Sequence, residues 1–193
     1  KSVSAGNIDL TGAGGTTTIQ KGDSDFLTAF SALSSTSNLR DTVTTPLDIV
    51  LVLDASGSMD DPMGRGDSTK RIAALKAAAN SFIDKIAESN GKIADELQRH
   101  RVSIVKFSGN KSEWVGNDTY RSGGYTYNYS QVMKTMTTVD ASGKDSLKST
   151  VNSIRPAGAT QADYGLELAS SQLASSGRAG APRVVGFFTD GAP

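Results

Sequence analysis

The sequence predicts an α/β domain with a mostly parallel sheet flanked by helices. Residues 47–53 form a nearly continuous apolar run, which is typical of a strand buried on both faces. Apolar residues then recur at steps of three and four over 72–86, as expected for a helix packed on the sheet, with Ser68 or Thr69 as its N-cap. These two patterns alternate along the chain, which indicates right-handed βαβ connections.

Five further elements are expected after this helix. A strand covers 102–107, and residues 108–140, with their many aromatic side chains, are expected to form a long hairpin or elaborated loop. Helices are expected over 147–154 and 162–173, and a last buried strand over 183–190. The most distinctive residues follow the strands, where ligands of open α/β sheets usually bind.

The composition of the chain changes at Pro46. Residues 1–45 are rich in Gly, Ser and Thr and lack a helical period, so we expect an extended N-terminal lead-in segment there. The domain itself is expected to span 46–193. The chain has no apolar run long enough for a transmembrane segment and opens without a signal segment, which indicates a mature fragment or an excised piece.

Composition excludes several classes of function. Lys and Arg together number 20, as do Asp and Glu, and no basic stripe carries interleaved aromatics, so a nucleic acid is not expected as a partner. Cysteine is absent, which excludes thiol catalysis, disulfides and Cys-based zinc sites. His100 is the single histidine, and its polar neighbours predict a surface position. A metal ion would therefore be held by oxygen.

Three separate segments offer oxygen ligands at the ends of predicted elements. The side chains are Asp54, Ser56 and Ser58 after the first strand, Thr160 in the loop before a helix, and Asp190 at the end of the last strand. Mg²⁺ takes six oxygens at about 2.0–2.1 Å, and hydroxyls, two carboxylates and waters supply that shell without filling it. Ca²⁺ and Mn²⁺ are alternatives. With so little negative charge around it, the ion should favour an external anionic oxygen, such as a partner's Asp or Glu.

The stretches 54–58, 158–160 and 189–191 resemble the metal-ion-dependent adhesion site of von Willebrand factor A domains, and the resemblance covers 46–193. It implies a Rossmann-like fold and a role for each residue. The residues in direct contact with the ion would be Ser56, Ser58 and Thr160, and those acting through bound water would be Asp54 and Asp190. The chain stops at Pro193, before the family's last strands and helices. The C-terminal part of the fold is thus expected to be missing or replaced by another segment.

The stretches 45–48, 117–120, 125–128 and 158–166 look like those of surface adhesins and pilus tip proteins of Gram-positive bacteria. This resemblance implies a non-enzymatic domain displayed on the cell wall or pilus. Its ligand would be a host or extracellular-matrix protein with an exposed Asp or Glu, bound through Mg²⁺, and other pilus subunits would be further partners.

Alternatives remain open for these residues. One alternative is a structural pilin module, in which the ion only stabilises loops. Another is a subunit of an enzyme complex, like the metal-chelatase partners that share this domain, and such a subunit would have an ATPase as its partner. Residues 54–58 alone also fit a polar turn in which Ser caps a helix. Enzymes fit poorly, because Ser56 stands where an aspartyl phosphatase needs Asp and an aspartic protease needs Gly. A Ser-His-Asp triad could use only His100.

Three other features are interpreted as structural. Residues 65–67 spell Arg-Gly-Asp, as in integrin ligands, and are interpreted as a solvated loop. Trp114 and the tyrosines of 120–129 could contact carbohydrate or protein, but packing within the hairpin is the favoured interpretation. Asp163 is interpreted as a charge in the first turn of a helix.

Overall fold

The structure is a computed structural model that describes residues 45–64 and 66–190. The lead-in segment expected at 1–45 lies outside the described residues, except for its last position. Within the described part of the chain, no helix is both long and apolar enough to cross a membrane.

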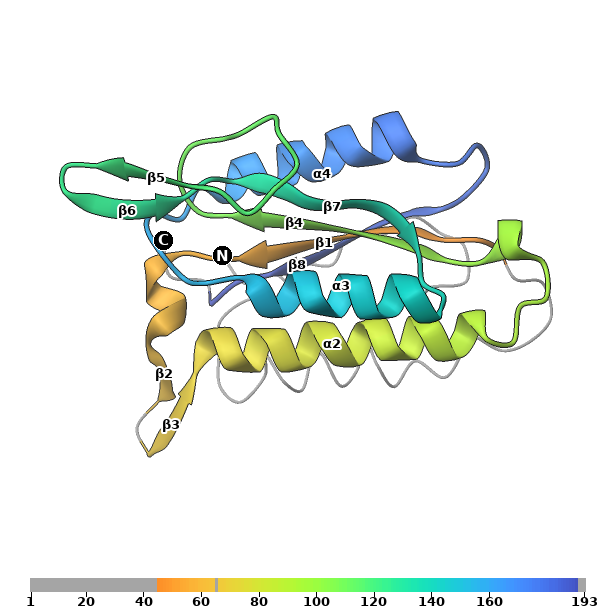
Figure 1. The fold of residues 1–193 in the computed structure, drawn as a ribbon, viewed down its shortest axis with the longest axis horizontal. Helices are drawn as coiled ribbons and strands as arrows, with labels where there is room; N and C mark the ends of the chain where they lie inside the picture. Colours follow the sequence, from red (N-terminus) through yellow and green to blue (C-terminus); the bar gives the residue numbers. More distant parts are fainter. Residues whose placement is uncertain (1–44, 65, 191–193) are drawn as a thin grey trace, which may run out of the picture.

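A four-stranded sheet forms the centre of the domain, in the order β7-β4-β1-β8 (Figure 1). Strand β1 (Asp48–Asp54) lies between β4 (Arg101–Phe107) and β8 (Arg183–Phe188) and is parallel to both. Strand β7 (Gln131–Thr138) pairs antiparallel with the outer side of β4. The predicted mostly parallel sheet, with the run at 47–53 as a central strand, is confirmed.

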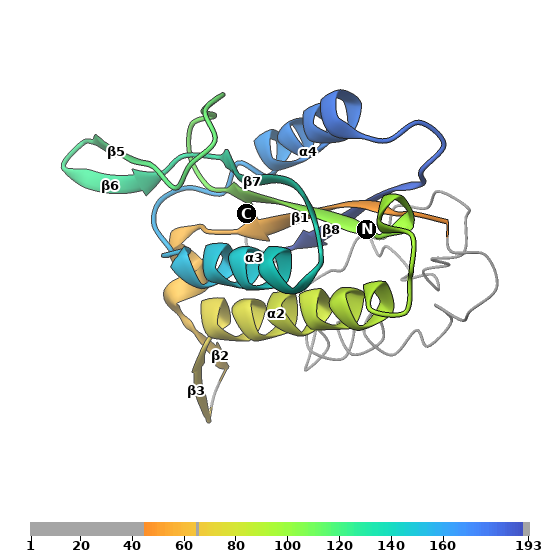
Figure 2. The same cartoon turned by 45° about the vertical axis from the view of Figure 1, so that its right-hand side comes forward.

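Helices cover both faces of this sheet (Figures 1 and 2). Helices α2 (Arg71–Asn90) and α3 (Ala141–Ser153) lie on one face, and α4 (Ala162–Ser176) lies on the other. All seven residues of β1 are buried, because its side chains point alternately to the two faces of the sheet and helices cover both faces. Its leucines therefore join the core under α2 and α3, whereas its valines join the core under α4.

The register of the strands places their carboxyl ends at one edge of the sheet. Asp54 is opposite Phe107 on β4, and Leu53 is opposite Phe188 on β8. The hairpin β2 (Pro62–Gly64) and β3 (Asp67–Lys70) projects from this same end. So does the hairpin described next (Figures 1 and 2).

The predicted elaboration at 108–140 contains two different structures. Strands β5 (Thr119–Ser122) and β6 (Tyr125–Asn128) form the expected hairpin. Residues 131–138, however, are the edge strand β7 of the main sheet, which the hairpin prediction did not anticipate. Only the first part of β7 is buried, so its sequence lacks the apolar run of a central strand.

The aromatic side chains of this region divide into packed and exposed groups. The Tyr120 ring stacks on Tyr127, with 5.3 Å between centroids, and lies 4.7 Å from Tyr129. This confirms the packing interpretation for these three rings. Trp114 and Tyr125, in contrast, are 81% and 72% exposed.

The predicted N-cap of the helix at 72–86 is wrong. Thr69 belongs to β3, and α2 begins at Arg71 after Lys70, which makes no side-chain capping bond. The Arg71 amide, one of the donors that a helix start leaves without an intrahelical acceptor, donates instead to the carbonyl of Asp61, directly before β2, at 3.0 Å. Asp163 does lie in the first turn of α4, as expected.

The predicted surface position of His100 is also wrong, because the side chain is only 2% exposed. It follows the short 3-10 helix Glu96–Gln98 and precedes β4. Its Nδ1 accepts a hydrogen bond from the Leu47 amide at 3.1 Å, and Asn90 bonds both its amide and its carbonyl. Burial, with a smaller contribution from the charge of Arg178, lowers the pKa of His100 to about 4. The imidazole is therefore a neutral core acceptor.

Candidate metal centre

Asp54 ends the central strand with a fully buried carboxylate. Its Oδ1 accepts from the Ser56 amide at 2.8 Å, and its Oδ2 accepts from the Thr189 hydroxyl at 2.7 Å. Burial raises the pKa of Asp54, hydrogen bonds from Ser56 and Thr189 lower it, and the charge of Asp190 raises it further. The net effect is a raised pKa, so a cation at this position would stabilise the charged form.

The two predicted serine ligands lie next to this carboxylate. The hydroxyl oxygens of Ser56 and Ser58 are 3.2 Å apart. Ser56 is the N-cap of the 3-10 helix Gly57–Asp60, but its side chain makes no capping bond. The hydroxyls are therefore not used for helix capping, which removes the main support for the polar-turn alternative.

Asp190 follows β8 and reaches the same edge of the sheet. Its Oδ2 accepts from Nη1 of Arg71 at 2.7 Å, and that Nη1 lies 3.4 Å from the carbonyl oxygen of Ser58. The residue before it, Thr189, donates its hydroxyl to Asp54 Oδ2 at 2.7 Å, and the charge of Asp190 raises the pKa of Asp54, so Asp190 lies on the Asp54 side of the sheet edge. The structure thus brings four predicted ligands together, and we call Asp54, Ser56, Ser58 and Asp190 the oxygen cluster.

The fifth predicted ligand lies on the segment 155–161, here called the Thr160 loop. Its backbone joins the loop after β1 through two hydrogen bonds, from the Ala157 amide to the Ala55 carbonyl (2.9 Å) and from the Gly57 amide to the Gly158 carbonyl (3.0 Å). Thr160 itself is partly exposed and makes no side-chain hydrogen bond to the described residues. The two loops therefore lie side by side through backbone bonds.

A positive φ fixes the shape of the Thr160 loop at one residue. Gly158 has φ +99°, and a Cβ there would lie 2.6 Å from Cδ1 of Tyr127. The hydroxyl of Ser108, directly after β4, donates to the carbonyls of Ala157 at 2.7 Å and Ala159 at 2.9 Å. The glycine is required for both conformation and space.

A buried polar network behind the two loops was not predicted from the sequence. Asn128, at the end of β6, donates through Nδ2 to the carbonyls of Ala55 (2.9 Å) and Arg155 (2.7 Å). Its Oδ1 lies 3.3 Å from Nζ of Lys106, which also donates to Asn117 Oδ1 at 2.8 Å. Burial lowers the pKa of this lysine to about 8. Asn128 thus connects the β5–β6 hairpin to both loops.

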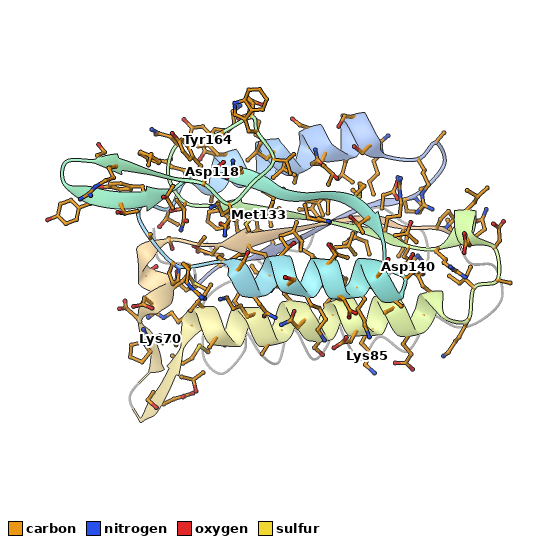
Figure 3. The ribbon with its side chains drawn as sticks, in the orientation of Figure 1. Lys70, Lys85, Asp118, Met133, Asp140 and Tyr164 are labelled. Atoms are coloured by element: carbon orange, nitrogen blue, oxygen red, sulfur yellow. The ribbon has the colours of Figure 1, made fainter. Side chains whose placement is uncertain are left out.

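Lys106 has a third acceptor, the Asp118 carbonyl at 3.0 Å. Asp118 lies beside the sheet (Figure 3), where its carboxylate accepts from Gln131 Nε2 at 2.7 Å. A lysine within an apolar strand gives no indication of such partners in the sequence, because they follow it by 11 to 22 residues and depend on the hairpin.

Arg71 is the other site residue that sequence reasoning missed. It stands 119 positions before Asp190, and its place in an amphipathic helix gives no hint of this pairing. Its guanidinium lies against Asp190, so this part of the oxygen cluster already has a positive charge as its neighbour.

The donor set fits a hard divalent cation. Among the described residues, no group of three or more His, Cys, Asp or Glu side chains could hold a metal, so an ion would depend on hydroxyls and water as well as on two carboxylates. Mg²⁺ prefers oxygen ligands and retains several waters, which matches this supply. Asp54 and Asp190 would provide the charge, and the serines and Thr160 the neutral oxygens.

Comparison with known sequences identifies a family over most of the chain. Residues 49–192 match the family described as von Willebrand factor type A domain. No curated protein shows significant similarity to the chain.

Solved structures with the same fold include three pilus proteins. The chain is 24% identical to the pilus adhesin SpaC from Lactobacillus rhamnosus GG in its open conformation, covering 80% of this chain and 16% of that one, with a TM-score of 0.53. The pilus adhesin RrgA from Streptococcus pneumoniae is 19% identical, with a TM-score of 0.53, and the match covers 77% of this chain and 20% of that one. The PilB minor pilin from Streptococcus sanguinis is 17% identical, with a TM-score of 0.53, and the match covers 78% of this chain and 31% of that one. The chain thus spans less than a third of each of these structures.

Proposed function

Since the chain belongs to the von Willebrand factor type A domain family, we propose that it is a non-enzymatic adhesion domain in which a divalent cation binds a carboxylate of a protein partner. The ion is Mg²⁺, with Ca²⁺ or Mn²⁺ as alternatives. The proposed ligands are Asp54, Ser56, Ser58, Thr160 and Asp190.

The oxygen cluster is the observation that carries this proposal. Two carboxylates and two hydroxyls from opposite ends of the domain sequence meet at the carboxyl edge of the sheet, and the hydroxyls have no capping role. Such a set supplies only two negative charges and leaves coordination positions of the cation to water, so an anionic oxygen from a partner can replace one of these waters.

The structural alternative, in which the ion only stabilises loops, receives less support. Backbone bonds already join the Ala55–Gly57 and Ala157–Gly158 segments, and the Asn128 side chain bonds both loops from behind. The Thr189 hydroxyl likewise connects the end of β8 to Asp54. The loops therefore have direct connections of their own, and a cation is better suited to ligand binding.

The proposed setting is the bacterial surface. SpaC and RrgA are pilus adhesins and PilB is a minor pilin, so display on a pilus or Gram-positive cell wall follows by analogy of fold. The proposed partners are a host or extracellular-matrix protein and other pilus subunits.

The test measures binding to a panel of immobilised extracellular-matrix proteins with Mg²⁺, with Mn²⁺ and with EDTA. Asp54→Ala and Ser58→Ala should lose the metal-dependent binding, whereas Asp60→Ala, a change to an exposed residue of the same loop, should retain it. Circular dichroism verifies that each variant is folded. Binding that survives both EDTA and Asp54→Ala would rule out the metal-bridged mechanism.

A further inference from the structure

A cationic side chain is built into the proposed metal centre. Nη1 of Arg71 lies 2.7 Å from Asp190 Oδ2 and 3.4 Å from the Ser58 carbonyl oxygen, so it contacts two of the residues that would surround the ion. The Asp190 side chain is only 6% exposed, whereas that of Arg71 is 21% exposed. Both members of this ion pair are therefore largely shielded from solvent, the carboxylate more than the guanidinium.

The backbone holds Arg71 in this position. It is the first residue of α2, and its amide donates to the Asp61 carbonyl at 3.0 Å, which fixes it against the loop that carries Ser58. Guanidinium groups keep their charge at all physiological pH values. The oxygen cluster thus has two carboxylates, and Arg71 adds one permanent positive charge beside it.

We propose that Arg71 determines the anion preference of the metal centre by offsetting the charge of Asp190. This inference rests on the proposed function. A divalent ion balanced by Asp54 and Asp190 alone would leave a neutral site, whereas with Arg71 the loaded site carries one net positive charge. An incoming carboxylate then neutralises the site, and a neutral or cationic group does not. The same charge weakens binding of the free cation.

The neighbouring Lys70 provides a matched control. It lies at the junction of β3 and α2 (Figure 3), carries the same charge, and pairs with exposed Asp60 at 2.8 Å. Its charge is paired with Asp60, which is not a member of the oxygen cluster, so its removal changes the net charge of the protein without removing the charge next to Asp190.

The experiment measures two affinities in the isolated chain. Isothermal titration calorimetry gives the Kd of Mn²⁺, and NMR titration gives the Kd of acetate for the Mg²⁺-loaded protein. Arg71→Gln should tighten Mn²⁺ binding and weaken acetate binding, each by roughly fivefold or more, since unit charges about 4 Å apart in water change an equilibrium by about that factor. Arg71→Lys and Lys70→Gln should remain within about twofold of the wild type.

Each other outcome overturns a defined part of the account. Weaker Mn²⁺ binding in Arg71→Gln would show that Arg71 positions Asp190 instead of opposing the ion. An equal effect from Lys70→Gln would reduce the result to general surface charge. Absence of Mn²⁺ binding in the wild-type chain would overturn the proposed function and this inference with it, whereas normal wild-type binding with unaltered Arg71→Gln affinities would overturn only the inference.

Discussion

Acidification should destabilise the domain through His100. The imidazole is buried between the start of β4 and Leu47, and its Nδ1 is the acceptor for the Leu47 amide. Protonation would place a second N–H against that amide and bury a charge. The folded protein therefore resists protonation, and burial holds the pKa of His100 at about 4 instead of 6.5.

The size and sign of the effect follow from proton linkage. Between pH 6.5 and 4 the unfolded chain binds a proton that the folded protein does not, so the free energy of unfolding falls as the pH falls. Each tenfold change in proton concentration over this window contributes about 1.4 kcal/mol, and the whole window contributes about 3 kcal/mol. Above pH 6.5 this contribution is complete, and below pH 4 it is lost.

Urea unfolding of the wild type and His100→Gln at pH 4, 5, 6 and 7 isolates this contribution. The variant lacks the titrating group but retains a side-chain acceptor, and the carboxylates titrate equally in both proteins. The variant should be the less stable protein at pH 7, and most of that difference should disappear or reverse by pH 4. A difference that stays constant from pH 7 to pH 4 would refute the reasoning.

Two substitutions test how the loops of the metal centre are held. Asn128→Ala removes donors to Ala55 and Arg155 and an acceptor of buried Lys106, so it should cost about 2–4 kcal/mol in urea unfolding and weaken Mn²⁺ binding in calorimetry. Gly158→Ala should cost about 1–3 kcal/mol, because it strains a positive φ and requires a neighbouring ring to move, and it should also weaken Mn²⁺ binding. Unchanged Mn²⁺ affinity in both folded variants would contradict the role given to these connections.

The sequence was informative where one local pattern determined the structure. The apolar run at 47–53 predicted β1, because a strand buried on both faces has apolar residues at successive positions. The period at 72–86 predicted α2, because a helix buried on one face has apolar residues at steps of three and four. The convergence of Asp54 with Asp190 followed from the rule that parallel strands end at one edge of a sheet.

The features that were missed depend on contacts between distant segments. Strand β7 is half-buried at the edge of the sheet, and its identity depends on pairing with β4. The sequence neighbours of His100 are polar, yet the side chain is buried, and its Nδ1 accepts from an amide 53 residues earlier. Arg71 likewise acquires its place at the site only through a partner at the other end of the domain.

Anomalous diffraction from crystals of the chain grown with Mn²⁺ tests the central claim most directly. The account predicts one strong peak at the carboxyl edge of the sheet, bonded to the hydroxyls of Ser56, Ser58 and Thr160 and close to the carboxylates of Asp54 and Asp190. A peak at another place, or an empty oxygen cluster at saturating Mn²⁺, would contradict it.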